Sequence, residues 1–431
     1  MRRSTMEDKF VEGGVCAARG YKANGVHCGL AHKVIAASNS GDETLKANLN
    51  PNAGKKNDLA AVFSEKRAAA AAVYTSNKVK GAPLIVTKRN IADGYAQAII
   101  CNSVNANTCN ADGEEKAEKM CVLLADKLGI DKNDVIVAST GVIGQVLPIE
   151  PIEKGIAPLC EGLSETGNTE AVRAIMTTDT VEKECAVRFS LSGKECTLGG
   201  MLKGSGMICP NMATNLTFLT TDADISPDML RKALSDVIQR TLNCVSVDGD
   251  MSTNDMCCVM ANGAAGNPRI ESENEDYGIF RAELEKVLRV LARKMAKDGE
   301  GATKLIECTV SSAPDFDTAK IVGKSVIMSN LFKAAIFGED ANVGRILCAI
   351  GYSAADVDIG KIDVDMASEA GRISVCRQGA CLDFSEELAA KILRCDEIQV
   401  LISLNAGDSE ATAWGCDLTY EYVKINGDYR S

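Results

Sequence analysis

A glycine- and proline-containing segment near the middle of the chain carries the strongest chemical signal. It runs Lys-Gly-Ser-Gly-Met-Ile-Cys-Pro-Asn-Met-Ala-Thr over residues 203–214. Its two glycines allow backbone conformations that other residues rarely adopt, while Pro210 fixes its own φ and removes a hydrogen-bond donor. Alternation of apolar and polar residues from Leu216 onward predicts a strand. Thr214 therefore ends an irregular loop at the entrance of a strand, where a reactive side chain can be held exposed.

A threonine hydroxyl becomes a nucleophile only when a base removes its proton. An N-terminal threonine can use its own α-amine, whose pKa lies near neutrality. Thr214 is internal, so this chemistry requires cleavage of the Ala213–Thr214 bond, which the hydroxyl can start by attacking the Ala213 carbonyl. An ordinary glycine turn that leads into a strand would show the same residue types. The spacing alone leaves both interpretations open.

The scarcity of histidine favours a nucleophile that brings its own base. The chain has two histidines, His27 and His32, in a stretch without a partner signature. A Ser–His–Asp or Cys–His mechanism would have to use one of them. The 18 cysteines are scattered without a C-x-x-C pair, so we expect no metal site and mostly reduced, buried thiols.

The composition predicts a globular protein that binds neither nucleic acid nor membrane. Of the 431 residues, 46% are hydrophobic and 25% are charged, with a formal net charge of −12. This acidic balance disfavours a general basic face for nucleic acid. No apolar run approaches the roughly 18 residues of a membrane span, and the first residues carry two arginines without an apolar signal region. We therefore expect a soluble, cytoplasmic protein.

Hydrophobic periodicity places the central loop among mixed elements. Short apolar runs predict strands at 59–63, 71–74, 83–87, 98–102 and 134–138. Helical spacing and capping residues predict helices over 114–128, 227–243 and 280–297. Residues 244–255 are expected to form a strand followed by a polar loop. The last part of the chain is expected to follow the order strand, strand, helix, strand, strand.

The segment Lys-Gly-x-Gly-Met-x-x-Pro-x-Met-Ala-Thr resembles the self-cleavage motif of the ArgJ family of glutamate N-acetyltransferases (ornithine acetyltransferases). Further matches are Ser-Thr-Gly-Val-Ile-Gly at 139–144, Val-Asp-Gly-Asp-Met-Ser-Thr-Asn-Asp at 247–255, and the segments 334–345 and 411–431. The resemblance therefore covers nearly the whole chain. The chain departs from the family pattern at Val104, Cys209, Asn215 and Val343, where Gly, His, Met and Trp are usual.

The resemblance implies an acetyltransferase that moves the acetyl group of N2-acetyl-L-ornithine to L-glutamate. Thr214 would be the nucleophile after autocleavage at Ala213–Thr214, and Thr140 and Gly141 would form the oxyanion hole. Bifunctional members also use acetyl-CoA as a donor, and no cofactor is implied. Substrate contacts are expected from Thr177, Lys203, Thr214, Glu300, Asn426 and Ser431.

The resemblance also implies a fold and an assembly. The fold is expected to be α+β, an ArgJ/DmpA-like sandwich with two central β-sheets between helix layers. Residues 1–213 would form the α chain and 214–431 the β chain of an α2β2 heterotetramer. Val104 leads us to expect a different loop at its position, because a β-branched residue adopts a positive φ only at a cost. Two rival functions stay open: a self-processing aminopeptidase or amidase of the same fold, and a non-catalytic binding protein.

Overall fold

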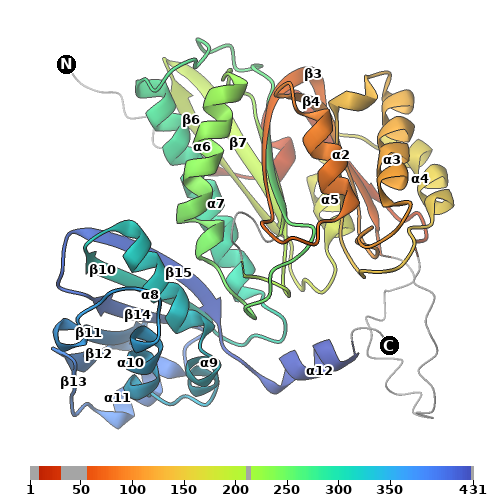
Figure 1. Cartoon of the computed structure of the whole chain (residues 1–431). Helices are drawn as coiled ribbons and strands as arrows, with labels where there is room; N and C mark the ends of the chain where they lie inside the picture. The colour runs from red at the N-terminus through yellow and green to blue at the C-terminus, as the bar shows by residue number, and fades with distance from the viewer. Residues whose placement is uncertain (1–8, 31–55, 210–214, 429–431) are drawn as a thin grey trace, which may run out of the picture.

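The computed structural model describes residues 9–30, 56–209 and 215–428, which form two β-sheets with helices packed against them (Figure 1). The nine-stranded sheet has the order β1-β6-β7-β8-β9-β3-β4-β5, with β2 paired to β3. The six-stranded sheet has the order β13-β12-β11-β14-β10-β15. We call each sheet with its helices the larger and the smaller lobe. The predicted α+β fold with two sheets is confirmed.

Along the described chain, the strands of the larger sheet come first and those of the smaller sheet follow. The larger sheet contains β1 (Lys9–Val11), β2 (Tyr21–Val26), β3 (Leu59–Tyr74), β4 (Tyr95–Asn102), β5 (Val135–Ser139), β6 (Lys183–Leu191), β7 (Lys194–Lys203), β8 (Leu216–Thr221) and β9 (Met256–Ala261). The smaller sheet contains β10 (Leu305–Ala313), β11 (Asp363–Ser368), β12 (Gly371–Arg377), β13 (Ala380–Cys381), β14 (Glu397–Ser403) and β15 (Ser409–Cys416).

Helices cover the sheets in layers. Those of the larger lobe are α2 (Ala82–Asn90), α3 (Gly113–Leu128), α4 (Ile149–Glu161), α5 (Asn168–Ile175), α6 (Pro227–Arg240) and α7 (Glu275–Lys297). The others are α8 (Phe316–Met328), α9 (Asn330–Phe337), α10 (Val343–Gly351), α11 (Glu386–Leu393) and α12 (Tyr420–Asp428). Among all these helices of the described residues, none combines the length and the apolarity that a membrane crossing requires.

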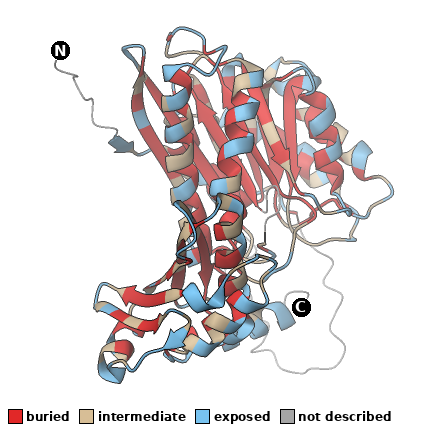
Figure 2. Cartoon of the chain, turned by 60° about the vertical axis from the view of Figure 1, so that its left-hand side comes forward, coloured by how far each residue is buried: buried red, intermediate tan, exposed pale blue. Residues whose placement is uncertain are grey.

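The large sheet is buried on both of its faces. Helices α2 and α3 contact β5, α6 contacts β3, and α7 contacts β6 and β7, while α5 contacts β2 and β3 from the other face. Figure 2 shows these strands buried along most of their length, whereas the outward faces of the helices are exposed. Several alanines of β3 lie in its cores, and such small side chains let helices and strands approach closely. The packed sheet therefore gives the loops at its ends a rigid support.

The central strands of this sheet come from both halves of the chain. Strands β7 and β8 are antiparallel neighbours, with Lys203 opposite Leu216. Strand β8 pairs in parallel with β9, and β9 pairs with β3. The segment that joins β7 to β8 therefore connects adjacent strands in the middle of the sheet, and a cut in it would leave both sides held by the same hydrogen-bonded ladder.

Trp414 joins the two lobes. It lies on β15 of the smaller sheet, but its ring, 1% exposed, belongs to the core of the larger lobe. Its Nε1 donates to Glu307 Oε2 at 2.9 Å, and the Arg289 guanidinium lies 5.5 Å from the ring centroid. Its carbonyl accepts from the Ser246 amide at 2.9 Å. The side chain and the backbone of one residue thus hold both lobes together.

Two expected strands are absent from the described structure. Residues 83–87 lie in helix α2, with Gly81 as N-cap and Pro83 in the first turn. A short apolar run fits a buried helix as well as a strand, and proline is tolerated at a helix start because the N–H there has no helical partner. At 244–255, a 3-10 turn (Leu242–Cys244) and a single bridge from Val245 to Trp414 precede the loop.

Most other elements agree with their predictions. The runs 59–63 and 71–74 are parts of one long strand, β3, and the helix from Pro227 ends at Arg240 rather than at 243. The predicted order strand, strand, helix, strand, strand agrees with β11, β12, α11, β14 and β15. The two-residue strand β13, between β12 and α11, and the final helix α12 were not predicted.

Replacement of Trp414 tests the junction between the lobes. Trp414→Ala should lower the free energy of unfolding by about 3–5 kcal/mol, because a large buried ring leaves a cavity. Unfolding in urea is followed by far-ultraviolet circular dichroism. Tryptophan fluorescence would not serve, because Trp414 is the one tryptophan of the chain and the variant lacks it. Tyr352→Ala is the control, because this side chain is 60% exposed and its loss should cost less than about 0.5 kcal/mol. Equal stability of both variants would contradict the assigned role.

Candidate active site

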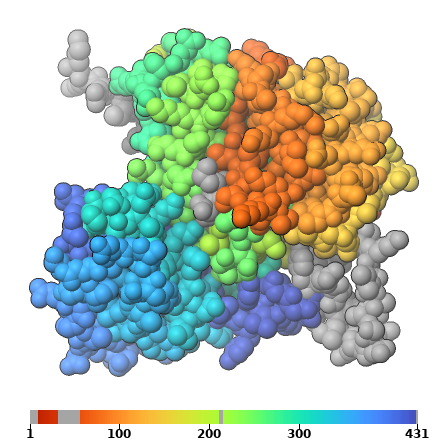
Figure 3. Space-filling model, viewed as in Figure 1, coloured from red at the N-terminus to blue at the C-terminus, as the bar shows by residue number. Residues whose placement is uncertain are grey.

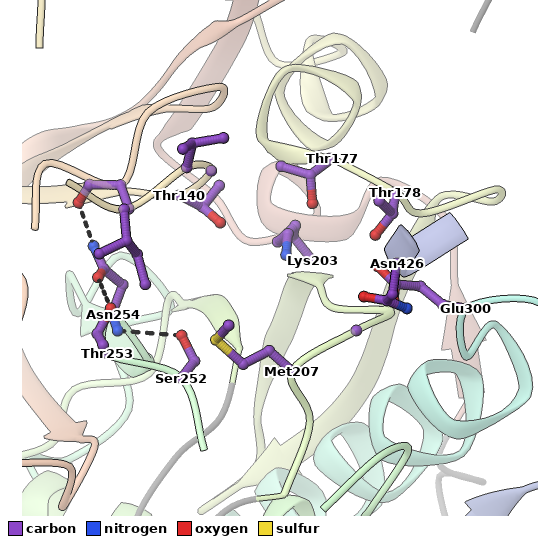
Figure 4. A pocket seen from close by; sticks show the side chains of 15 residues that line it. Thr140, Thr177, Thr178, Lys203, Met207, Ser252, Thr253, Asn254, Glu300 and Asn426 are labelled. Atoms are coloured by element: carbon purple, nitrogen blue, oxygen red, sulfur yellow. Dashed lines mark hydrogen bonds between the residues drawn. The ribbon is translucent and has the colours of Figure 1, made fainter. Parts of the chain in front are cut away.

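One pocket gathers residues from seven separate segments of the chain (Figure 4). Its volume is about 370 Å³. Six residues expected at a site from the sequence line it: Thr140, Gly141, Thr177, Lys203, Glu300 and Asn426. The expected residues Ala213, Thr214 and Ser431 lie outside the described residues. The roles of all these residues stay predictions, but the fold brings six of them to one place.

The loop after β5 presents two hydrogen-bond donors. The Thr140 amide donates to the Asn102 carbonyl at 3.0 Å, and the Val142 amide donates to the Val104 carbonyl at 3.0 Å. Gly141, between them, has φ 131° and a Cβ there would overlap the Val104 carbonyl, so only glycine fits. Within the described residues, the Gly141 N–H and the Thr140 hydroxyl have no hydrogen-bond partner. Both donors can therefore serve a group in the pocket.

Val104 keeps the backbone conformation that glycine would favour. Its φ is 78°, so the expected change of the loop at this position is not seen in the backbone angle. The loop is held because the Val104 carbonyl accepts from Val142 and because Asn105 and Val142 form a β-bridge. A β-branched residue at positive φ is strained. The surrounding hydrogen bonds maintain this strain beside the Thr140–Gly141 turn.

Asn254 fixes three loops around the same turn. Its Nδ2 donates to the carbonyls of Ala106 at 2.6 Å and Ser139 at 2.9 Å. Its Oδ1 accepts from the hydroxyls of Thr108 and Thr253, each at 2.6 Å. The buried amide therefore has partners for both of its polar atoms. Asn254 belongs to the matched 247–255 motif, but the sequence did not indicate that its side chain would join these loops.

A buried charge cluster lies behind the opposite wall. The Lys183 ammonium, which is fully buried, contacts Asp179 at 2.7 Å and also pairs with Asp298. Asp179 further accepts from the amides of Gly204 at 2.8 Å and Thr177 at 3.0 Å. The cluster thus connects the segment after α5, strand β6, the end of β7 and the end of α7.

Electrostatics keep this cluster ionised. Burial opposes the charge of Asp179, but the Lys183 and Lys203 ammonium groups, together with hydrogen bonds, lower the pKa of its carboxyl below the usual range. Lys203, at the end of β7, is mostly buried and lines the pocket. In the part of the chain that the structure describes, its ammonium has no direct ion-pair partner. It is therefore a cation available to an anionic group of a ligand.

Glu300 and Asn426 form the far side of the pocket. The Glu300 carboxylate accepts from Asn426 Nδ2 at 2.8 Å, and its amide donates to the Ser205 carbonyl at 3.0 Å. A Cβ on Gly206 would overlap this carboxyl group. Helix α12, which carries Asn426, lies between the smaller lobe and the underside of the larger one (Figure 3).

Asp248 shapes the loop that leads away from β7. Its carboxylate accepts from the amides of Met207 at 2.7 Å and Ile208 at 2.9 Å, and the Val247 amide donates to the Ile208 carbonyl at 2.8 Å. Met207, at φ 56°, lines the pocket. The Asp-rich 247–255 segment therefore supports the site through the Asp248 carboxylate and the Val247 amide, which bind the backbone of Met207 and Ile208. The described residues contain no group of three or more acidic, cysteine or histidine side chains arranged to hold a metal ion.

A second, smaller cavity adjoins the pocket. Its volume is about 20 Å³, and Thr140 and Lys203 line both spaces. Ile208 and Asn215 also line it. These two residues lie on either side of the segment 210–214 in the sequence, so the chain approaches and leaves that segment at this cavity.

Comparisons with known proteins cover nearly the whole chain. The model of the ArgJ family matches residues 43–431. The chain is 49% identical over 377 residues to the arginine biosynthesis bifunctional protein ArgJ of Caldanaerobacter subterraneus subsp. tengcongensis, which covers 87% of this chain and 94% of that protein. It is 50% identical over 377 residues to ArgJ 1 of Clostridium acetobutylicum, with 87% and 92% covered. For ArgJ of Bacillus licheniformis, identity is 43% over 425 residues, with 98% of each chain covered.

Removal of the central cation tests the buried cluster. Lys183→Met should destabilise the protein by about 3–5 kcal/mol, because Asp179 and Asp298 would remain buried without their partner. In the native protein, the contribution of Asp179 is complete above its unfolded pKa of about 4. It is lost as the pH falls towards the lower folded pKa. Urea unfolding at pH 7 and at decreasing pH measures both effects.

The matched control removes an exposed lysine. Lys127 pairs with Glu161 at 3.2 Å on the surface, and Lys127→Met should cost less than about 1 kcal/mol. A Lys183→Met variant as stable as this control would show that the cluster does not hold the site.

Proposed function

Because this chain belongs to the ArgJ family, we propose that it transfers the acetyl group of N2-acetyl-L-ornithine to L-glutamate through an acetylated Thr214. The observation that carries this proposal is that one pocket brings the required groups together. Among the described residues, it combines two donors without a hydrogen-bond partner, at Thr140 and Gly141, with a cation at Lys203 and a carboxylate at Glu300. It also adjoins the cavity lined by Ile208 and Asn215, on either side of the segment that ends in Thr214.

The first half-reaction transfers the acetyl group to the enzyme. The Thr214 hydroxyl attacks the acetyl carbonyl, and its α-amine, freed by cleavage, accepts the proton. The Thr140 hydroxyl and the Gly141 N–H donate to the oxyanion, and one such donor stabilises the transition state by about 3 kcal/mol. The bond between the acetyl carbon and N2 then breaks, and ornithine leaves after its nitrogen takes up the proton.

The second half-reaction reverses this order with glutamate. Its amine attacks the acetyl-Thr214 ester, the C–O bond breaks, and N-acetyl-L-glutamate leaves. Lys203 would bind a substrate carboxylate and Glu300 an ammonium group, with Thr177, Asn426 and Ser431 as further contacts. The reaction needs no cofactor, and acetyl-CoA is an alternative donor to be tried in the same assay.

Self-cleavage would divide the chain into residues 1–213 and 214–431. We propose that these α and β chains stay together and form an α2β2 assembly. The strand order supports the proposal that the two chains stay together, because β8 and β9 of the β chain lie between β7 and β3 of the α chain. Two central strand pairs, β7–β8 and β9–β3, would then connect the pieces.

The nucleophile is tested by Thr214→Ala. Wild-type protein should separate into two bands on a denaturing gel but elute as one species under native conditions, with Thr214 at one new N-terminus. It should transfer acetyl from acetylornithine to labelled glutamate. The variant should stay full length and lose all measurable transfer, because it has no hydroxyl to attack. Its far-ultraviolet circular dichroism should match that of the wild type.

The same assay separates the rival functions. Release of free acetate without labelled N-acetylglutamate would identify a hydrolase, and absence of both products would favour a binding protein. Activity in Thr214→Ala would remove this residue from the mechanism.

The ligand-binding role of Glu300 is tested through Gly206. Gly206→Ala should displace the Glu300 carboxylate, because the new Cβ would occupy its position. Loss of a charge-assisted hydrogen bond costs about 1.5–3 kcal/mol, so the KM for glutamate should rise by roughly ten- to a hundredfold with a smaller change in kcat. Steady-state transfer kinetics measure both constants.

Gly278→Ala is the matched control. Gly278 lies in α7 with open space around its Cβ position. Alanine favours a helix over glycine, so this variant should keep the wild-type KM and fold at least as stably. An unchanged KM in Gly206→Ala would contradict the role of Glu300.

A further inference from the structure

Asp255 is a buried acid that the proposed acetyl transfer does not use. It directly precedes β9, and its side chain is 3% exposed. Its Oδ2 atom is buried and has no hydrogen-bond partner within residues 9–30, 56–209 and 215–428. A buried polar atom without a partner is costly, so it is rare without a functional reason.

The carboxyl group lines the small cavity that adjoins the pocket. This cavity, of about 20 Å³, is also lined by Thr140, Lys203, Ile208 and Asn215. Its size suffices for a group as large as one water molecule. Asp255 therefore shares this small cavity with Thr140 of the expected oxyanion hole and with residues on both sides of the segment 210–214.

The pairing of β8 with β9 brings Asp255 beside the start of β8. Leu216 and Met256 are partners in the parallel ladder, and the Met256 amide donates to the Asn215 carbonyl at 2.8 Å. Asn215 and Asp255 are thus the residues that directly precede two neighbouring strands. Thr214 is the next residue before Asn215 in the sequence.

The surroundings favour the neutral form of this acid. Burial raises the pKa of the Asp255 carboxyl well above its usual range, while Ser252 and Lys203 act in the opposite direction. Lys203 is the other charged side chain among the described residues that line the cavity. A neutral carboxylic acid has both an O–H donor and an acceptor oxygen. It can therefore give one proton and receive another in the same step.

We propose that Asp255 transfers the protons in self-cleavage at Ala213–Thr214, an inference that rests on the proposed function. The Thr214 oxygen forms a bond to the Ala213 carbonyl carbon while its proton passes to one Asp255 oxygen. The other Asp255 oxygen gives its proton to the amide nitrogen as the C–N bond breaks. Asp255 ends neutral, and the product is an ester with a free amine. Water then hydrolyses the ester, leaving a carboxyl group on Ala213 and the hydroxyl on Thr214.

Asp255→Asn tests this assignment, because the amide keeps the shape of a neutral carboxyl group but cannot exchange protons in this way. The full-length chain is made by a short pulse of cell-free synthesis, and its conversion to two pieces is followed on denaturing gels. General acid–base catalysis contributes roughly 10²–10⁴-fold, so cleavage should slow at least a hundredfold. Asp250→Asn, the same change at an exposed position of the same loop, should cleave at the wild-type rate.

Each outcome decides the matter. Slow cleavage in an Asp255→Asn chain with wild-type circular dichroism and thermal midpoint supports the proposal, and wild-type cleavage of that chain overturns it. If this variant does not fold, the pH profile of the wild-type chain decides: the rate should fall as the pH rises and Asp255 loses its proton, and a constant or rising rate overturns the proposal. An uncleaved wild-type chain would overturn the proposed function as well, so the two failures are distinguishable.

Discussion

The buried Lys183 ammonium between Asp179 and Asp298 is the interaction on which the arrangement of the pocket depends. It joins elements that are distant in the sequence, since β6 supplies the cation and the end of α7 supplies Asp298. Removing charges from water costs several kcal/mol per ion. That cost is offset only where each oxygen has a partner. Here the backbone amides of Thr177 and Gly204 complete the set for Asp179, and Thr180 completes it for Asp298. The cluster therefore determines where Thr177 and Lys203 can lie.

The interleaved sheet would let the proposed cleavage occur without dismantling the fold. If the chain is cut between β7 and β8, each of these strands stays paired on both sides: β7 with β6 and β8, and β8 with β7 and β9. The hydrogen bonds of the ladder do not depend on the covalent connection. A hydroxyl nucleophile and its freed amine can thus be supported by a rigid sheet on either side.

The sequence was informative wherever residue identity itself determines the local chemistry. Glycine at 141 is required by its φ and by contact with Val104, and it lies in a motif that could be recognised. Contacts between distant residues were not visible: Asn254 joins Ala106 and Ser139 across more than a hundred residues. The helix at 82–90 was missed because a five-residue apolar run has no period that separates helix from strand. The resemblance to a known family thus pointed to six residues that line the pocket, whereas neither it nor local pattern indicated what positions them.

The charges of the pocket suit a ligand that carries both signs. Lys203 helps to keep Asp179 ionised, yet it forms no direct pair with that acid among the described residues, so its ammonium protons remain for a ligand. Glu300 is held differently, through a neutral amide from Asn426, which orients the carboxylate without cancelling its charge. A free amino acid has one carboxylate and one ammonium group at its α-carbon. Neither the cation nor the anion of this pocket has a direct ion-pair partner in the described part of the chain, so the pocket is complementary to such a molecule. A wholly basic or wholly acidic pocket would repel half of it.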